Sequence, residues 1–135
     1  MSPMPRRILT DRALFFVPAG YDAYQKPTAE QRLEIHNVHF QGDNITKRVN
    51  TDASGYDTEV TLKGVLFLDA RYSRPAYGAL PDLEELQRAA QRAGGVLTCD
   101  IFNRAGVSVG PYTVLTVDAL PDDEGRLHHY EIGVV

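Results

Sequence analysis

The sequence predicts a mainly β protein, a small β-barrel or sandwich of five or six strands with one inserted α-helix at about 82–93. Short runs of β-branched and aromatic residues recur with a period of two, the spacing at which side chains share one face of a strand. The 135 residues include eight prolines and eleven glycines, as suits a fold with many turns. In one segment, at about 82–93, apolar residues recur at the spacing of a helix.

The clearest strand pair is the C-terminal segment 111–135, PYTVLTVDALPDDEGRLHHYEIGVV. Leu115 and Val117 share a face in its first arm, and Tyr130 and Ile132 share one in its second. The intervening PDDEG has the residues of a tight turn. We expect a hairpin whose last strand is paired within the sheet.

Further apolar runs predict strands at 13–18, 33–41, 58–69 and 96–102. In the run 33–41, Leu33 and Ile35 share one phase, but Val38 and Phe40 have the opposite phase. One extra residue near 36–37 would restore a single apolar face, so we predict a β-bulge there. Gly64 interrupts the run 58–69 and marks a bend or a close backbone contact.

The helix over 82–93 is predicted by a narrow apolar stripe that includes Leu83, Leu86 and Ala90. Acidic residues stand at its start and arginines near its end, which matches the helix dipole. Gly94 and the glycine after it are expected to end it.

The domain organisation we expect is a flexible N-terminal arm over 1–12 and a single β-barrel domain over 13–135. The domain contains a long polar loop at 42–57, and loops of this length in compact domains are often functional. Arg6, Arg7 and Arg12 give the arm positive charge. The arm is either an ordinary solvated terminus or a segment that docks on an acidic partner, and the sequence leaves both open.

The sequence predicts neither catalytic residues nor a cofactor or metal. Nucleophile, P-loop and zinc-peptidase motifs are lacking, and Cys99 is interpreted as a small buried hydrophobe. His128 and His129 are adjacent on a strand, so their imidazoles are expected to point to opposite faces. The formal net charge of −4 argues against a broad basic face that grips nucleic acid.

The chain has no apolar run of membrane-spanning length, and its first residues lack the apolar core of a signal peptide. We therefore expect no membrane partner, and a protein that is made and used in a cytosol or in something assembled there.

Three segments together suggest a family: GVLFLDARYSRP at 64–75, YTVLTVDAL at 112–120 and RLHHYEIGV at 126–134. With the polar loop after LEIHNVHF, the chain resembles the head–tail connector proteins of long-tailed bacteriophages. These are neck proteins of the stopper or head-completion type, also described as minor capsid proteins. The likeness covers about 31–135, and a weaker similarity covers 13–24.

The resemblance implies a virion protein, assembled in the host cytoplasm, whose β-barrel subunits form a homo-oligomeric ring, a hexamer in the family pattern. The ring joins the portal and adaptor proteins of the head to the tail terminator or tail tube protein below. Double-stranded DNA passes through it during genome packaging and release without specific binding. In stoppers a loop between two strands closes the channel, and in this chain that loop corresponds to 42–57. The alternative, that this loop packs against a neighbouring subunit, stays open.

Residues for these roles follow from the resemblance and from residue chemistry. Within the loop, the channel-facing or gating groups we expect are Asn44, Lys47, Arg48 and Asn50. For the subunit interface we expect Tyr72, Arg74 and Tyr77, because tyrosine and arginine are enriched at interface centres.

Two alternatives stay open. The helix at 82–93 departs from the compact connector pattern, and tail-completion proteins also carry such a helix, so a tail terminator or tail-completion ring is one alternative. The other is an unrelated small enzyme or ligand-binding β-barrel, which would need a deep pocket with converging polar groups.

Overall fold

The computed structural model of this protein describes residues 5–21, 24, 27–42, 45–50 and 57–135. Its elements, in chain order, are the 3-10 helix η1 (Arg6–Ile8), β1 (Asp11–Tyr21), β2 (Pro27–Gln41), β3 (Ile45–Asn50), β4 (Asp57–Leu62), β5 (Gly64–Asp69), β6 (Arg74–Pro75), α1 (Leu83–Arg92), β7 (Thr98–Phe102), β8 (Tyr112–Pro121) and β9 (Leu127–Val134).

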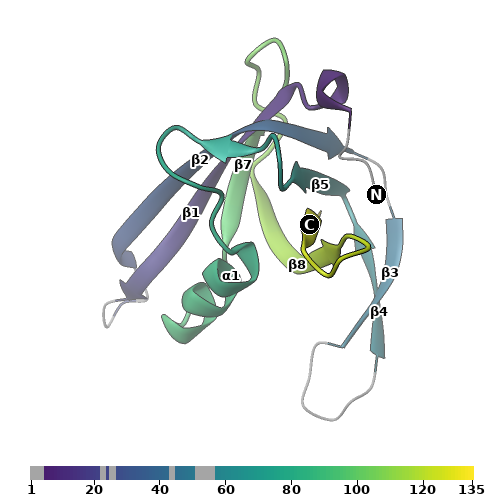
Figure 1. The fold of residues 1–135 in the computed structure, drawn as a ribbon. Helices are drawn as coiled ribbons and strands as arrows, with labels where there is room; N and C mark the ends of the chain where they lie inside the picture. Colours follow the sequence, from purple (N-terminus) through teal and green to yellow (C-terminus); the bar gives the residue numbers. More distant parts are fainter. Residues whose placement is uncertain (1–4, 22–23, 25–26, 43–44, 51–56) are drawn as a thin grey trace.

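Most strands form one antiparallel sheet in the order β1-β7-β8-β9-β5-β2-β6, and an additional pairing of β1 with β2 closes it into a ring (Figure 1). Six strands, β1, β7, β8, β9, β5 and β2, therefore surround a common interior. Closure leaves the paired stretches of these strands without free edges. The predicted mainly β fold, a small barrel with one inserted helix, is confirmed.

The barrel interior is filled by apolar side chains from every strand of the ring, together with α1. Its fully buried members include Phe15, Ile35, Leu66, Ile101 and Ile132. The alternation predicted for the last strand is confirmed, because Tyr130, Ile132 and Val134 are all buried.

The β-bulge predicted near 36–37 is confirmed at Asn37. In the β1–β2 ladder Arg12 pairs with His36 and Asp11 pairs with Val38, so Asn37 is the extra residue. Its backbone has a φ of 61°, a left-handed conformation that asparagine tolerates better than most residues. After the bulge, β2 leaves β1 and pairs with β5.

Gly64 separates two strands where we expected one continuous strand over 58–69. A Cβ built at Gly64 would lie 2.5 Å from the Phe40 ring and 2.8 Å from the carbonyl oxygen of Gln41. The bend and the close contact predicted for this glycine are both present, and they direct β4 and β5 into different sheets.

The prediction of a long polar loop over 42–57 was partly wrong. Within it, 45–50 is the strand β3, which pairs with β4 in a separate two-stranded sheet. We call this pair the β3–β4 ribbon; Figure 1 shows it beside the barrel, at the right of the view. Polar composition concealed the strand, because a ribbon outside the core needs no apolar alternation.

Helix α1 confirms the predicted helix within a residue at each end. The Asp82 carboxylate caps it by accepting hydrogen bonds from the backbone N–H groups of Glu84 and Glu85. Leu83 and Ala90 are fully buried, and Gly94 adopts a φ of 85° just after the helix.

One other expectation is corrected. The single alternation predicted along the first arm of the closing hairpin breaks at Leu115, because the register shifts between Val114 and Thr116.

In the described part of the predicted N-terminal arm, η1 is followed by the buried Leu9, and β1 begins at Asp11.

Candidate interaction surface around Tyr72

The turn between β5 and β6 is fixed by a buried polar network. Asp69 and Ser73 are both completely buried. The Asp69 carboxylate accepts hydrogen bonds from the backbone N–H groups of Arg71 (2.9 Å) and Tyr72 (3.0 Å). The Ser73 hydroxyl accepts from the backbone N–H of Asp69 at 2.8 Å. Buried polar groups that are fully hydrogen-bonded favour one backbone conformation, so this turn is rigid.

The bulge in β2 anchors the same turn. Asn37 donates a side-chain hydrogen bond to the carbonyl oxygen of Tyr72 at 3.1 Å. In return, the Ser73 hydroxyl donates to the carbonyl oxygen of Asn37 at 2.6 Å. The bulge therefore holds the turn against the barrel wall.

Arginines from two distant parts of the sequence meet at this turn. The guanidinium carbons of Arg6 and Arg71 lie 6.0 and 5.8 Å from the centre of the Tyr72 ring. These distances are at the outer limit of cation–π contact. Arg74 donates from Nη1 to the carbonyl oxygens of Ala70 (2.7 Å) and Ser73 (2.8 Å). We call Arg6, Arg71, Tyr72 and Arg74 the arginine–tyrosine surface.

Within the described ranges, the guanidinium groups of the arginine–tyrosine surface form no ion pair with a carboxylate, while the buried Asp69 carboxylate bonds to the backbone of Arg71 and Tyr72 in the same turn. Several other arginines have acidic partners: Arg12 contacts Glu34, and Arg92 contacts Glu85. Hydrogen bonding from Arg12 lowers the pKa of Glu34, and hydrogen bonding from Arg92, then Arg88, lowers that of Glu85.

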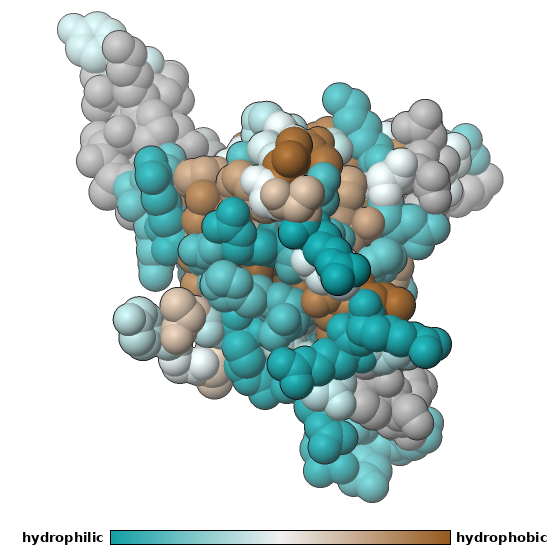
Figure 2. All heavy atoms as spheres, turned by 90° about the horizontal axis from the view of Figure 1, so that it is seen from above, coloured by the Kyte–Doolittle hydropathy of each residue, from teal (hydrophilic) through white to brown (hydrophobic). Residues whose placement is uncertain are grey.

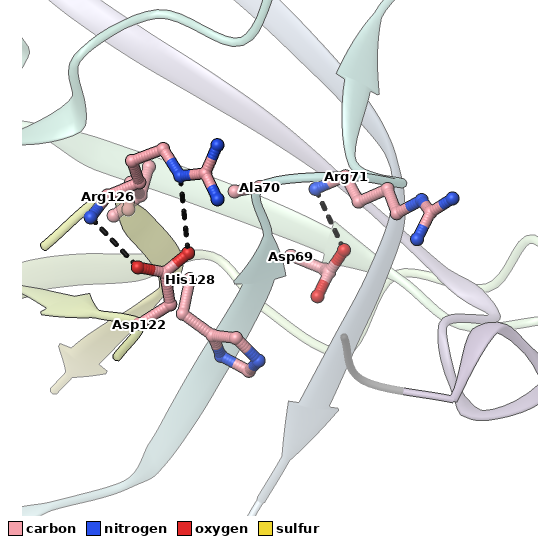
Figure 3. A pocket seen from close by; sticks show the side chains of 7 residues that line it. Asp69, Ala70, Arg71, Asp122, Arg126 and His128 are labelled. Carbon is pink, nitrogen blue, oxygen red and sulfur yellow. Dashed lines mark hydrogen bonds and ion pairs between the residues drawn. The ribbon is translucent and has the colours of Figure 1, made fainter. Parts of the chain in front are cut away.

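An open cleft of about 410 Å³ separates this turn from the β8–β9 turn. Figure 3 shows Asp69, Ala70 and Arg71 on one wall and Asp122, Arg126 and His128 on the other. The Arg71 side chain extends away from Asp122 and Arg126 (Figure 3).

The β8–β9 turn is acidic and well formed. Asp122 Oδ1 accepts hydrogen bonds from the backbone N–H groups of Glu124 (2.8 Å) and Arg126 (2.9 Å). The Arg126 backbone bond is the main cause of the lowered pKa of Asp122. The exposed Arg126 guanidinium contacts both Asp122 and Glu124, and Asp123 adds a third carboxylate in the same turn.

Residues predicted for two separate roles, partner docking and subunit interface, thus share one surface: Arg6 from the arm, and Tyr72 and Arg74 from the loop. Arg12 lies elsewhere, with its guanidinium carbon 4.2 Å from the centre of the Phe102 ring. Arg7 is exposed on η1.

The other predicted interface residue, Tyr77, is 93% exposed and borders a different, smaller cleft beside Pro75. Lys47, Arg48 and Asn50 lie on β3 and belong to the ribbon. Asn44 lies outside the described residues.

Sequence reasoning missed the Asp69–Ser73 network and its link to Asn37. An aspartate at the end of a strand with a serine four residues later is a signal for a side-chain-capped turn, and it was available in DARYS. The contact of Arg6 with Tyr72 has no such signal, because it depends on tertiary structure.

The two adjacent histidines correct another expectation. The Nδ1 atoms of His128 and His129 lie 2.7 Å apart, so the rings contact each other instead of pointing to opposite faces. In the part of the chain that the structure describes, no group of three or more His, Cys, Asp or Glu side chains is arranged to hold a metal ion.

Cys99 is buried, and desolvation raises its pKa to about 12, which agrees with its interpretation as a small hydrophobe. Among the described residues, no helix is both long and apolar enough to cross a membrane.

Comparison with known proteins found no family model that matches the chain and no curated protein that matches it.

Proposed function

We propose that this protein is a structural subunit of a bacteriophage neck, and that copies of it form a ring joining the head to the tail. The observation that carries the proposal is the β3–β4 ribbon, which lies between two strands of a closed barrel at the sequence position of the stopper loop. The resemblance at 64–75, 112–120 and 126–134 supplies the type of assembly.

The barrel suits a subunit of a ring because its own paired strands leave few free edges within the molecule. The ribbon is different, since β3 and β4 pair only with each other among the described strands. In our proposal the barrel is the rigid wall, and the β3–β4 ribbon extends into the central opening around the DNA.

Native mass spectrometry and electron microscopy of the purified full chain test the ring. We expect a single closed oligomer, with six copies as the family pattern implies, and an opening at its centre. A protein that stays monomeric over a wide concentration range, alone and with phage capsid or tail components, would contradict the proposal.

The second candidate is a ring at the tail end of the same machine, a tail terminator or tail-completion protein. Helix α1 favours it, because such a helix is part of the tail-completion pattern and not of the compact connector pattern. Antibody labelling of this protein in intact particles separates the two positions: label where head meets tail supports the neck, and label within the tail supports the alternative.

A further inference from the structure

We infer that His128 and His129 form an acid-sensitive contact: their rings share one proton through a hydrogen bond, and the contact breaks when a second proton binds. We call these two residues the histidine pair. The inference is independent of the proposed function, because it starts from two neighbouring side chains of β9.

The contact between the two rings joins nitrogen to nitrogen. The Nδ1 atoms of His128 and His129 lie 2.7 Å apart, and the ring centres lie 4.9 Å apart with an angle of 81° between the ring planes. An imidazole nitrogen either carries a proton and donates, or lacks one and accepts. A separation of 2.7 Å therefore requires a proton on one Nδ1 atom and none on the other.

Strand geometry alone does not produce this contact. Adjacent side chains of a strand project to opposite faces. In β9 the inward-facing positions after the pair are Tyr130 and Ile132, which are buried in the barrel. The rings of His128 and His129 have to turn toward each other from opposite faces, so the hydrogen bond is the interaction that holds them together.

The immediate surroundings favour a first proton on the pair but not a second. Glu131 Oε1 lies 3.3 Å from His129 Nε2, so a positive charge on His129 has a carboxylate partner. In that state His129 donates from both nitrogens, and His128 accepts as a neutral ring. A second proton would set two N–H groups and two positive charges against each other, and the His129 side chain is only 17% exposed to screening water.

The neighbouring strands add carboxylates on both sides of β9. On β5, Asp69 is the register partner of His129, and its carboxylate accepts hydrogen bonds from the backbone of the following turn. On β8, Leu120 is opposite His129 and Asp118 is opposite Glu131. These charges change how readily the pair binds a proton, but they do not remove the clash between two Nδ1–H groups.

Two further groups of titratable or charged side chains face the pair. His39 on β2 is separated from it by the Phe67 ring, whose centre lies 5.8 Å from that of His39 and 6.5 Å from that of His129. The charged residues that line the open cleft together with His128 are Asp69, Arg71, Asp122 and Arg126 (Figure 3). Separation of the rings would therefore also change the wall of this cleft.

Acid should weaken the fold at the histidine pair. In the unfolded chain both imidazoles take up protons near pH 6.5, as free histidine does. The folded chain with the contact intact binds one proton fewer, and stability falls with decreasing pH where the unfolded state binds more protons. The contribution of the contact is therefore present above about pH 6.5 and is lost as the pH falls and the second proton binds.

His36 on β2 is the matched comparison. Its side chain is 49% exposed, and its Nε2 lies 3.7 Å from Glu34 Oε1. Figure 2 shows the molecule from above, where hydrophilic side chains cover most of the surface with smaller apolar areas between them. Charges on a hydrophilic surface are screened by water, so a proton on His36 should have little effect on folding.

NMR spectroscopy of the isotope-labelled full chain tests the contact directly. We expect a scalar coupling between the two Nδ1 nuclei of the histidine pair at about pH 7.5, because such a coupling passes only through a hydrogen bond. The coupling should be lost by about pH 5, where a second proton has bound. This measurement uses the unmodified protein and does not depend on any variant folding.

A titration of the imidazole signals in a variant tests the coupling between the two protons. His128→Asn removes one imidazole, so His129 should then bind its proton in a single step. In the unmodified protein the second proton of the pair should need at least about tenfold higher proton concentration than that step. His36→Asn is the control and should leave the titration of the pair unchanged. Thermal unfolding establishes that both variants are folded.

Absence of the coupling at about pH 7.5 would overturn this inference. So would a pair whose two protons bind in the unmodified protein at the same pH as the single proton of His129 in His128→Asn. Neither outcome bears on ring assembly, so the proposed function stands or falls separately.

Discussion

The barrel and the β3–β4 ribbon are both antiparallel β structure, but they are stabilised in different ways. In the barrel, the pairing of β1 with β2 closes the sheet, and apolar side chains fill the interior. The ribbon has two strands, pairs only with itself within the described ranges, and contributes no strand to the ring. An isolated two-stranded ribbon is marginally stable in water. The stable fold and the segment proposed to act in the channel are therefore separate parts of one domain.

Removing core volume from the barrel should have the largest effect on stability. Ile132 is fully buried on β9, between β5 and β8. We expect Ile132→Ala to lower the free energy of unfolding by about 2–5 kcal/mol, because it leaves a cavity as well as losing apolar contact. Denaturant titration followed by circular dichroism measures this. The exposed Val107→Ala is the control, and equal losses in both variants would contradict the proposed core.

The junction between barrel and ribbon should be the next most sensitive position. Gly64→Ala would place a Cβ 2.5 Å from the Phe40 ring and 2.8 Å from a backbone oxygen. We expect a loss of about 1–3 kcal/mol from this overpacking. Gly42→Ala meets the same ring at 3.2 Å, without a backbone contact, and should cost clearly less. If the two variants unfold at the same denaturant concentration, the close approach at Gly64 is wrong.

A smaller, pH-dependent effect is expected at Glu34 on the β1–β2 ladder. Its pKa is lowered by the hydrogen bond from Arg12, so the bond stabilises the fold above the unfolded-state pKa, and this contribution is lost as pH falls through the folded-state pKa. Because the two side chains are 37% and 35% exposed, solvent screening limits the effect to roughly 0.2–1 kcal/mol. The difference in unfolding free energy between the unmodified protein and Glu34→Gln should be present at neutral pH and disappear in acid; a difference that grows in acid would contradict this account.

Shortening the ribbon should have the smallest effect on the fold. Replacing 46–60 with a short Gly-Ser linker keeps the buried Leu62 and should leave the unfolding free energy of the barrel within about 0.5 kcal/mol. Thermal unfolding checks this expectation. A large loss of stability would show that the ribbon is part of the folding unit, and the separation between the two regions would be lost.

The sequence predicted those parts of the fold that are determined by residues close together in the chain. The opposite phases of Ile35 and Val38 required the bulge at Asn37, and the apolar stripe with Asp82 before it defined α1. Alternation in the last strand followed from burial of one face. The break at Leu115 was missed, because both alternating sets of residues along this strand contain apolar side chains, so a change from one set to the other is not visible in the sequence.

The candidate surface could be predicted only in pieces. From their chemistry alone, Tyr72 and Arg74 were predicted as interface residues and Arg6 as a docking residue, and these roles stay predictions. Arg6 and Tyr72 are more than sixty positions apart in the chain, so their proximity depends on tertiary structure. The path of β2 and the buried Asp69 network bring these segments together. The β3 strand was missed because polar residues without alternation resemble a loop.

Distances between spin labels within the assembled ring test most directly whether the ribbon lies at the central opening. The buried Cys99, with its pKa raised to about 12, should not react, so Thr46→Cys at an exposed position of β3 and Arg104→Cys on the exposed 103–109 loop can be labelled separately. We predict shorter separations between copies labelled at position 46 than between copies labelled at position 104. Longer separations at position 46 would place the ribbon on the outside of the ring and contradict the proposed role.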